Sequence, residues 1–275
     1  MTTKPLNVLC IGAHPDDCDF QISGIALKYR ALGHNVCFVS MTNGDAGHFE
    51  MGGGALAQRR YEETQAVAAA ADLEYIVFDI HDGELEPTIE VRKRIISLMR
   101  EKQAALVICH RSNDYHPDHR ASGIAVQDAA YTVIVPNIVP FVPHVRRAPV
   151  VGYMYDNFTI PTPYIPHIAV DTDDVFERKV DLAHCHVSQV YEWLPYSEEK
   201  LEQVPPASDE PARRAWLAAG LRKRFEGVAD DLRPALIRLY GEERGKAIKT
   251  AESISISEYG RQPAPEEYKT LFPFF

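Results

Sequence analysis

Residues 6–17 read LNVLCIGAHPDD, an apolar run followed at once by a histidine, a proline and two adjacent carboxylates. The run over residues 6–13 is rich in Val, Ile and Leu, which is typical of a parallel strand buried on both faces. Charged groups are costly to keep at the end of such a strand. The stretch therefore predicts either a turn, which Pro and Asp favour, or a site that uses the charges.

Strand-like and helix-like runs alternate from this stretch onward. Further strands are predicted at 35–42, 74–80, 104–110 and 148–157. Helices are predicted between them at 22–35, 55–71 and 89–102. This alternation is typical of βαβ units. We expect an α/β fold, a single Rossmann-like domain with a mostly parallel sheet in the order 3-2-1-4-5 and helices on both faces.

The alternation weakens after residue 157. Residues 172–194 are predicted to form one long helix, and residues 195–212 are polar and rich in proline. We expect a Rossmann-like catalytic domain over residues 1–194 and a helical C-terminal extension, residues 195–275, packed on the same domain. The apolar ending LFPFF, residues 271–275, is predicted to dock on the body or on a neighbouring subunit.

Composition narrows the function classes. The chain has 275 residues, 45% of them hydrophobic, and a net charge of −10, which argues against nucleic-acid binding. No apolar stretch is long enough to span a membrane, and the first residues lack a signal-peptide pattern, so we expect a cytoplasmic protein. The odd number of cysteines, without a C-x-x-C pair, predicts free thiols: Cys10, Cys18, Cys37, Cys109 and Cys185.

A second polar cluster follows the predicted strand at 104–110. That strand ends in His110, and the next loop contains Asp114, His116, Asp118 and His119. In the order 3-2-1-4-5, this strand lies beside the first strand, where ligands bind in open α/β sheets. The two clusters should therefore meet. A divalent cation would relieve the repulsion between their carboxylates, and mixed His and carboxylate ligands suit catalytic zinc.

Each of the two polar motifs has a simpler interpretation when it is considered alone. HPDD could be a turn, and HPDH could begin a helix capped by Asp118 or Ser112. In a metal site, one carboxylate should remain outside the coordination shell as a general base, but spacing does not decide between Asp16 and Asp17. A nucleotide-binding Rossmann protein is disfavoured, because residues 11–17 lack the G-x-G-x-x-G pattern.

AHPDD (13–17) and HPDH (116–119) together resemble the paired motifs of the PIG-L (LmbE-like) family of zinc-dependent deacetylases. Residues 59–75, 81–85, 183–189 and the C-terminal segment from residue 251 are also similar to family sequences, so the resemblance spans nearly the whole chain. One position departs from it. Cys18 stands where many members have Glu, and we interpret it as a buried structural residue.

The resemblance implies specific roles. His14, Asp17 and His119 would bind Zn²⁺, with another divalent metal such as Fe²⁺ as the alternative. Asp16 would be the general base, and His116 would be the cationic partner that stabilises the oxyanion. The remaining expected site residues are Asp118, which would orient a neighbouring His, and Arg60 and Asp82, which would bind substrate.

The implied reaction is metal-dependent hydrolysis of the acetamide of an N-acetylglucosamine-type sugar or its conjugate. Some family members form trimers or hexamers, so the resemblance is compatible with a homo-oligomer but leaves the oligomeric state open. A zinc-dependent amidase or esterase acting on a thiol or secondary-metabolite conjugate remains the alternative. A metal-binding protein without catalysis is disfavoured because Asp16 and His116 are both present. The glycine-containing loop 43–54 is expected at the pocket mouth as a possible lid, with His48 in solvent.

Overall fold

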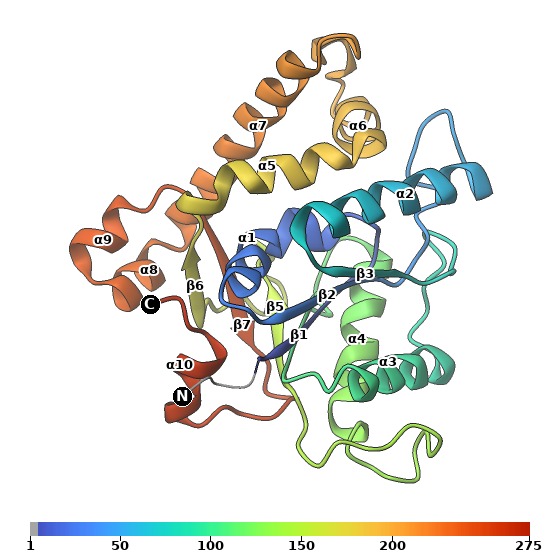
Figure 1. The fold of residues 1–275 in the computed structure, drawn as a ribbon, viewed down its shortest axis with the longest axis vertical. Coiled ribbons are helices and arrows are strands. Elements are labelled where there is room, and N and C mark those ends of the chain that lie inside the picture. Colours follow the sequence, from blue (N-terminus) through green and yellow to red (C-terminus); the bar gives the residue numbers. More distant parts are fainter. Residues whose placement is uncertain (1–4) are drawn as a thin grey trace.

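The computed structural model describes residues 5–275 and is built around a seven-stranded sheet in the order β3-β2-β1-β4-β5-β7-β6 (Figure 1). The first five positions in that order are parallel, and β7 runs antiparallel to both its neighbours, β5 and β6. The strands are β1 (Asn7–Gly12), β2 (Asn35–Ser40), β3 (Glu74–Val77), β4 (Leu106–Cys109), β5 (Val150–Met154), β6 (Ile168–Asp171) and β7 (Ala251–Ile256). The predicted α/β class and the order 3-2-1-4-5 are confirmed.

Helices cover both faces of the sheet (Figure 1). Alternate residues of a strand point to opposite faces, so Val8 and Cys10 pack under α1, whereas Leu9 and Ile11 pack under α3 and α4. The helices are α1 (Asp17–Ala31), α2 (Gly53–Ala71), α3 (Ile89–Glu101), α4 (Pro117–Thr132), α5 (Phe176–Cys185), α6 (Leu194–Ser197), α7 (Glu210–Asp231), α8 (Arg233–Tyr240), α9 (Glu242–Ala247) and α10 (Tyr268–Leu271). Among residues 5–275, no helix has the length and apolar character needed to cross a bilayer.

The C-terminal region is not only helical. Strand β7 inserts between β5 and β6, so residues after 195 complete the same sheet as residues before 194. The division at residue 194 stays a prediction, but the two parts share one sheet. The apolar ending docks on the body as expected: Phe272 is fully buried, and the ring of Phe274 packs edge-on against Tyr29 of α1.

The prediction of one helix over residues 172–194 is wrong. Helix α5 ends at Cys185, and a separate π-helical turn spans Gln189–Trp193 before α6. The break has a local cause, because the backbone N–H and the hydroxyl of Ser188 both donate to the buried carboxylate of Glu63 on α2. These side-chain bonds replace the helical ones at this point.

Candidate active site

The two polar clusters meet at the carboxyl edge of the sheet. Strands β1 and β4 are hydrogen-bonded neighbours, with Ile11 opposite Cys109. Both are parallel strands, so the loops that follow them emerge side by side. His14 and Asp17 come from the loop after β1 and the start of α1, and His119 comes from the first turn of α4. The sequence prediction that HPDD and HPDH converge is confirmed by these contacts.

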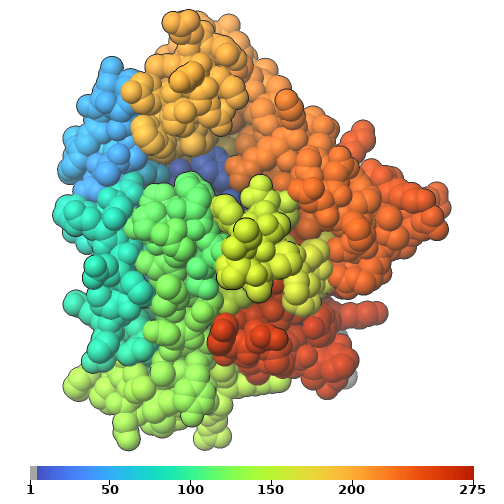
Figure 2. Space-filling view, turned by 180° about the vertical axis from the view of Figure 1, so that it is seen from behind, coloured from blue at the N-terminus to red at the C-terminus, as the bar shows by residue number. Residues whose placement is uncertain are grey.

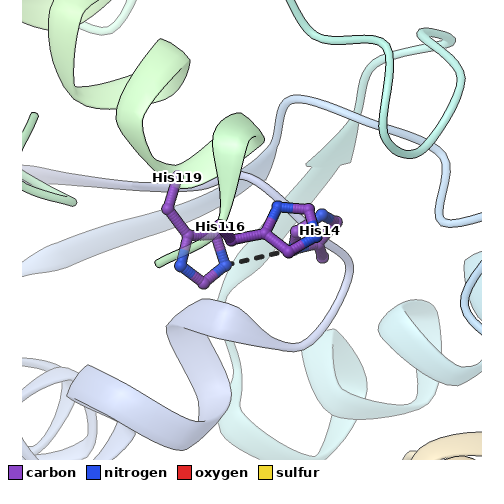
Figure 3. A group of neighbouring side chains, drawn as sticks. All are labelled: His14, His116 and His119. Carbon is purple, nitrogen blue, oxygen red and sulfur yellow. Dashed lines mark hydrogen bonds between the residues drawn. The ribbon is translucent and has the colours of Figure 1, made fainter. Parts of the chain in front are cut away.

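The three expected ligands point at one another. Nδ1 of His14 lies 3.2 Å from Nε2 of His119 and 3.4 Å from a carboxylate oxygen of Asp17. Nε2 of His119 lies 3.3 Å from the other oxygen of Asp17. Figure 3 shows the rings of His14 and His119 facing each other, with His116 beside them.

The far nitrogen of each imidazole lies beside carboxylates, and that of His119 is hydrogen-bonded to one. Nδ1 of His119 lies 3.0 Å from Asp114, and Nε2 of His14 lies 3.1 Å from Asp82 and 3.4 Å from Asp118. A carboxylate on the outer N–H is the usual support of a metal-binding His, because it fixes the ring and leaves the inner nitrogen unprotonated. Asp118 and Asp82 both lie beside His14, and Asp118 also accepts the backbone N–H groups of Gly83 and Leu85. The role of Asp118 in orienting a neighbouring His stays a prediction.

These donors fit a divalent metal ion. Ligand atoms bound to one tetrahedral zinc at its usual distances lie about 3.3 Å apart, close to the 3.2 Å between the facing nitrogens of His14 and His119. Each of these nitrogens also lies at a similar distance from one of the two oxygens of Asp17. The oxygen of Asp17 nearer to His14 is held by the backbone N–H groups of Ala13 and His14, so the oxygen that faces His119 is the freer of the two. Three overlapping groups of donors in the described residues lie within 4.8 Å of one another: His14, His116 and His119; Asp17, His110 and His119; and His14, Asp82 and Asp118.

The charges in this cluster are strongly coupled. Burial alone would raise the pKa of Asp17, but His119 and His110 lower it well below its usual range. Burial alone would lower the pKa of His119, but Asp17 and Asp114 raise it to about 9. A bound cation would take over this stabilisation of Asp17 and would displace a proton from His119.

Asp16 occupies a separate position from Asp17. Although it precedes α1 as the N-cap residue, its carboxylate makes no capping bond and lies 3.1 Å from Nη2 of Arg60. Burial raises the pKa of Asp16, and the positive charge of Arg60 partly offsets this. The structure thus gives the two adjacent aspartates different surroundings: Asp17 faces imidazoles, and Asp16 faces a guanidinium.

Arg60 is deeply buried, with 2% of its surface exposed. Besides Asp16, its guanidinium contacts Asp82 at 3.7 Å and donates to the carbonyl of Gly44. Gly44 has a left-handed φ of 70°, and a Cβ there would lie 2.5 Å from Nη1 of Arg60. The predicted role of Arg60 and Asp82 in substrate binding stays a prediction, since both side chains already have partners within the protein.

His116 begins α4 and closes the site on one side. Its own Nδ1 accepts the backbone N–H of Asp118, so the HPDH motif does start a helix, but the cap is His116 and not Asp118 or Ser112. Because Nδ1 is occupied as an acceptor, Nε2 is the nitrogen available to a ligand. Burial and the neighbouring His14 and His119 lower the pKa of His116, which favours a neutral ring with its proton on Nε2. The expectation that His116 is cationic is therefore corrected: a neutral Nε2–H is the available donor.

Two residues without an assigned role in the sequence contribute to the site. His110 lies 3.1 Å from Asp17 and stacks on His119 with ring centroids 4.0 Å apart. Asp114 binds the outer nitrogen of His119, as described above. Their position in the loop after β4, within reach of the HPDH motif, is the signal that could have identified both.

The position of Cys18 is confirmed as structural. Its thiol is 1% exposed, lies in the core under α1 and donates to the carbonyl of Cys10. The next residue, Asp19, provides a buried carboxylate instead, which accepts from the hydroxyl of Tyr75 and lies 3.1 Å from Nε2 of His186. The polar contacts of Asp19 therefore support the start of α1. Asp19 lies one residue after Cys18, the position where many family members have Glu.

The expectation that His48 faces solvent is wrong. Its side chain is 4% exposed, and Nε2 lies 2.9 Å from Glu192. Phe49 stacks on Tyr196, and Gln189 donates to the carbonyl of Gly47. The 43–54 loop thus packs on the segment around α6, and the last two of its five glycines, Gly53 and Gly54, belong to α2.

A cavity of about 1000 Å³ opens above these residues. Figure 2 shows it as a hollow with N-terminal residues, in dark blue, at its floor. The gold α6 region, the green start of α4, the yellow-green segment near residue 160 and the orange α7 surround it (Figure 2). The predicted site residues that line it are His14, Asp16, Asp17, Arg60, Asp82, His116 and His119.

Sequence comparison agrees with this arrangement. The family model for PIG-L, described as GlcNAc-PI de-N-acetylase, matches residues 9–130. Diacetylchitobiose deacetylase of Thermococcus kodakarensis is 33% identical over 206 residues, covering 69% of this chain and 74% of that protein. The chain belongs to the PIG-L family. As a PIG-L protein, it is a hydrolytic N-deacetylase.

Solved structures confirm the PIG-L fold over almost the entire chain. N,N'-diacetylchitobiose deacetylase from Pyrococcus horikoshii has a TM-score of 0.70 at 22% identity, with 94% of this chain and 88% of that chain covered. GalB, the 4-carboxy-2-hydroxymuconate hydratase from Pseudomonas putida, has a TM-score of 0.72 at 18% identity, with 94% and 98% covered. The same fold therefore carries other reactions, and the site decides the chemistry.

Proposed function

We propose that the protein removes the acetyl group from an N-acetylated amino sugar of the N-acetylglucosamine type, free or within a conjugate. The observation that carries this proposal is the convergence of His14, Asp17 and His119 beside a separate carboxylate, Asp16, on the floor of one cavity. The relative from Thermococcus kodakarensis is named for a diacetylated disaccharide, which supports the substrate class.

The proposed resident ion is zinc, with Fe²⁺ as the alternative, bound by His14, Asp17 and His119. Two imidazoles and one carboxylate are the donor set of a catalytic zinc that keeps a position open. When bound, the metal supplies Lewis-acid polarisation of the acetamide carbonyl and lowers the pKa of a water molecule.

Protein groups perform the proton transfers. Asp16 accepts the proton of the attacking water, and Arg60 orients its carboxylate and partly offsets the burial that raises its pKa. Nε2–H of His116 donates to the oxygen on which negative charge develops. The proton that Asp16 has accepted then passes to the departing amine, so the products are acetate and the free amino sugar.

The cavity accommodates more than the reacting acetamide. Its volume of about 1000 Å³ is at the upper end of small-molecule pockets, which span roughly 300–1,000 Å³. A sugar ring together with an aglycone fits this size class. Assembly into a trimer or hexamer and a cytoplasmic location stay predictions.

Acetate release tests the proposal. Purified protein, stripped with a chelator and reloaded with Zn²⁺ or Fe²⁺, is incubated with N-acetylglucosamine, diacetylchitobiose and an N-acetylglucosaminide. We expect acetate in stoichiometry with new primary amine, lost on chelation and restored by metal. The same panel includes an acetate ester and an N-acylated thiol conjugate. Turnover of those two with none of the sugars would replace the deacetylase by the alternative amidase or esterase.

A further inference from the structure

Three arginines line the cavity, and two of them are already neutralised within the protein. Arg60 pairs with Asp16, as described above. Arg111 pairs with Asp156 and donates to the carbonyls of Phe158 and Thr162, which fixes the wall formed by the segment after β5. Neither guanidinium is left to bind a charged ligand.

Arg224, on the cavity-facing side of α7, differs from both. Within residues 5–275, no carboxylate or carbonyl lies within hydrogen-bond or ion-pair distance of its guanidinium, and the side chain is exposed to the cavity. It is close enough to the floor of the cavity for the negative charge of Asp17 to act on it. Arg224 is thus a cation on the cavity wall that has no direct ion-pair or hydrogen-bond partner in the described part of the chain.

Most carboxylates around the cavity are bound elsewhere. Asp114 is bound by His119, and Asp156 by Arg111. Glu252 pairs with the buried Lys179 and accepts two backbone N–H groups of α1. Asp231, two helical turns from Arg224, accepts the hydroxyl of Tyr155. Among residues 5–275, no carboxylate therefore lies within ion-pair distance of Arg224, although Asp17, Glu198 and Glu252 act on it from further away.

Space for a ligand is preserved next to this cation. Gly227 lies one turn after Arg224 on the same face of α7 and also lines the cavity. A Cβ on Gly227 would meet no atom within 4 Å. A glycine inside a helix costs about 1 kcal/mol relative to Ala, and here it leaves the volume beside Arg224 open.

We propose that Arg224 is a specificity-determining residue that selects amino-sugar conjugates carrying a phosphate or carboxylate on the aglycone. This inference rests on the proposed deacetylase function. A guanidinium binds either anion through two parallel N–H···O bonds, and partial removal from water strengthens such contacts. The acetamide would lie at the His14–Asp17–His119 cluster while the anionic end of the same molecule reaches α7.

The test compares three probes on the metal-loaded enzyme: N-acetylglucosamine 1-phosphate, the carboxymethyl glycoside and the neutral methyl glycoside of N-acetylglucosamine. We expect the wild type to prefer at least one anionic probe by kcat/KM. In Arg224→Ala this preference should fall about ten- to hundredfold, mainly through KM, as expected for loss of charge-assisted hydrogen bonds. The anionic probe whose kcat/KM decreases more in Arg224→Ala shows whether Arg224 recognises phosphate or carboxylate.

Lys223→Ala is the matched control. Lys223 is exposed on the same turn of α7 but does not line the cavity, so its removal changes net charge equally without touching the proposed contact. We expect its probe preferences to equal those of the wild type. Equal losses in Lys223→Ala and Arg224→Ala would indicate a general charge effect, and an unchanged preference in Arg224→Ala would reject the assignment.

Failure of the proposed deacetylase function would give a different experimental result. If the wild type releases acetate from none of the three probes, the deacetylase substrate class is wrong. Calorimetric binding of N-acetylglucosamine 1-phosphate to metal-loaded wild type and Arg224→Ala then still decides the role of Arg224. Equal affinity for the two proteins would overturn the inference, and about tenfold weaker binding to the variant would support it.

Discussion

The guanidinium of Arg60 lies 3.1 Å from the carboxylate of Asp16, and both side chains are buried at the floor of the cavity. A buried carboxylate without a cation would be protonated over much of the neutral range. Arg60, which comes from α2, therefore affects the pKa and the orientation of Asp16, which precedes α1. This contact favours a positioning role for Arg60 over direct substrate binding.

Replacing Arg60 with Met tests that role. We expect kcat to fall about a hundredfold or more while KM changes little, because the general base loses its orientation and charge. The acid limb of the kcat profile should also move to higher pH. A raised KM with unchanged kcat would instead support the substrate-binding prediction. Since removing one partner of a buried ion pair can cost about 3–5 kcal/mol, thermal unfolding of each preparation is measured first.

Substitutions of Asp16 and Asp17 should have different effects, one on turnover and the other on metal content. In Asp16→Asn, we expect turnover to fall by about two to four orders of magnitude, the usual contribution of a positioned proton acceptor, with metal content unchanged. In Asp17→Asn, metal content itself should fall. Elemental analysis of both proteins, beside their acetate release, provides the check. Full turnover in Asp16→Asn would remove it from the mechanism.

The meeting of the two polar motifs could be predicted from sequence for a topological reason. Parallel strands place their carboxyl ends at one edge, so the order 3-2-1-4-5 alone puts His14 beside His119. The pairing of Asp16 with Arg60 could not be predicted, because α2 reaches the site only through its packing on the sheet. The environment of His48 depends likewise on Glu192, far away in sequence.

Strand β7 was missed for a different reason. Residues 251–256, AESISI, are buried on both faces and include Glu252 and two serines, so their composition does not indicate a central strand. Lys179 on α5 makes that composition possible, because it pairs with Glu252 inside the core. Only the folded chain brings the two charges together.

Asp114 is expected to tune metal binding through His119. Its carboxylate accepts from Nδ1 of that ring at 3.0 Å, and loss of such a partner usually lowers metal affinity about ten- to a hundredfold. We expect this decrease in Asp114→Ala, measured by competition with a chromogenic zinc chelator. Asp114→Asn keeps an acceptor oxygen and should recover most of the affinity. Unchanged affinity in Asp114→Ala would show that His119 is oriented by packing alone.

Glu192 is expected to make stability depend on acid pH. Burial alone would raise the pKa of Glu192, but Arg59 and His48 lower it below its usual value. A carboxyl group whose pKa is lower in the folded state stabilises the fold above its unfolded pKa, near 4.3, and this contribution disappears as pH falls through the folded pKa. Glu192→Gln should therefore be less stable than the wild type at pH 7, by about 1 kcal/mol or about 3 °C in Tm.

That difference should close as the pH falls through the folded pKa of Glu192, which lies below its usual value, because the wild-type carboxyl group is then protonated as well. Thermal unfolding of the metal-loaded proteins between pH 3 and pH 8 measures it. Glu202→Gln is the matched control, because Glu202 is exposed and the same charge is removed; its Tm should follow the wild type at every pH. A Tm difference for Glu192→Gln that stays constant with pH would mean that shape, not charge, fixes the 43–54 loop to the α6 region.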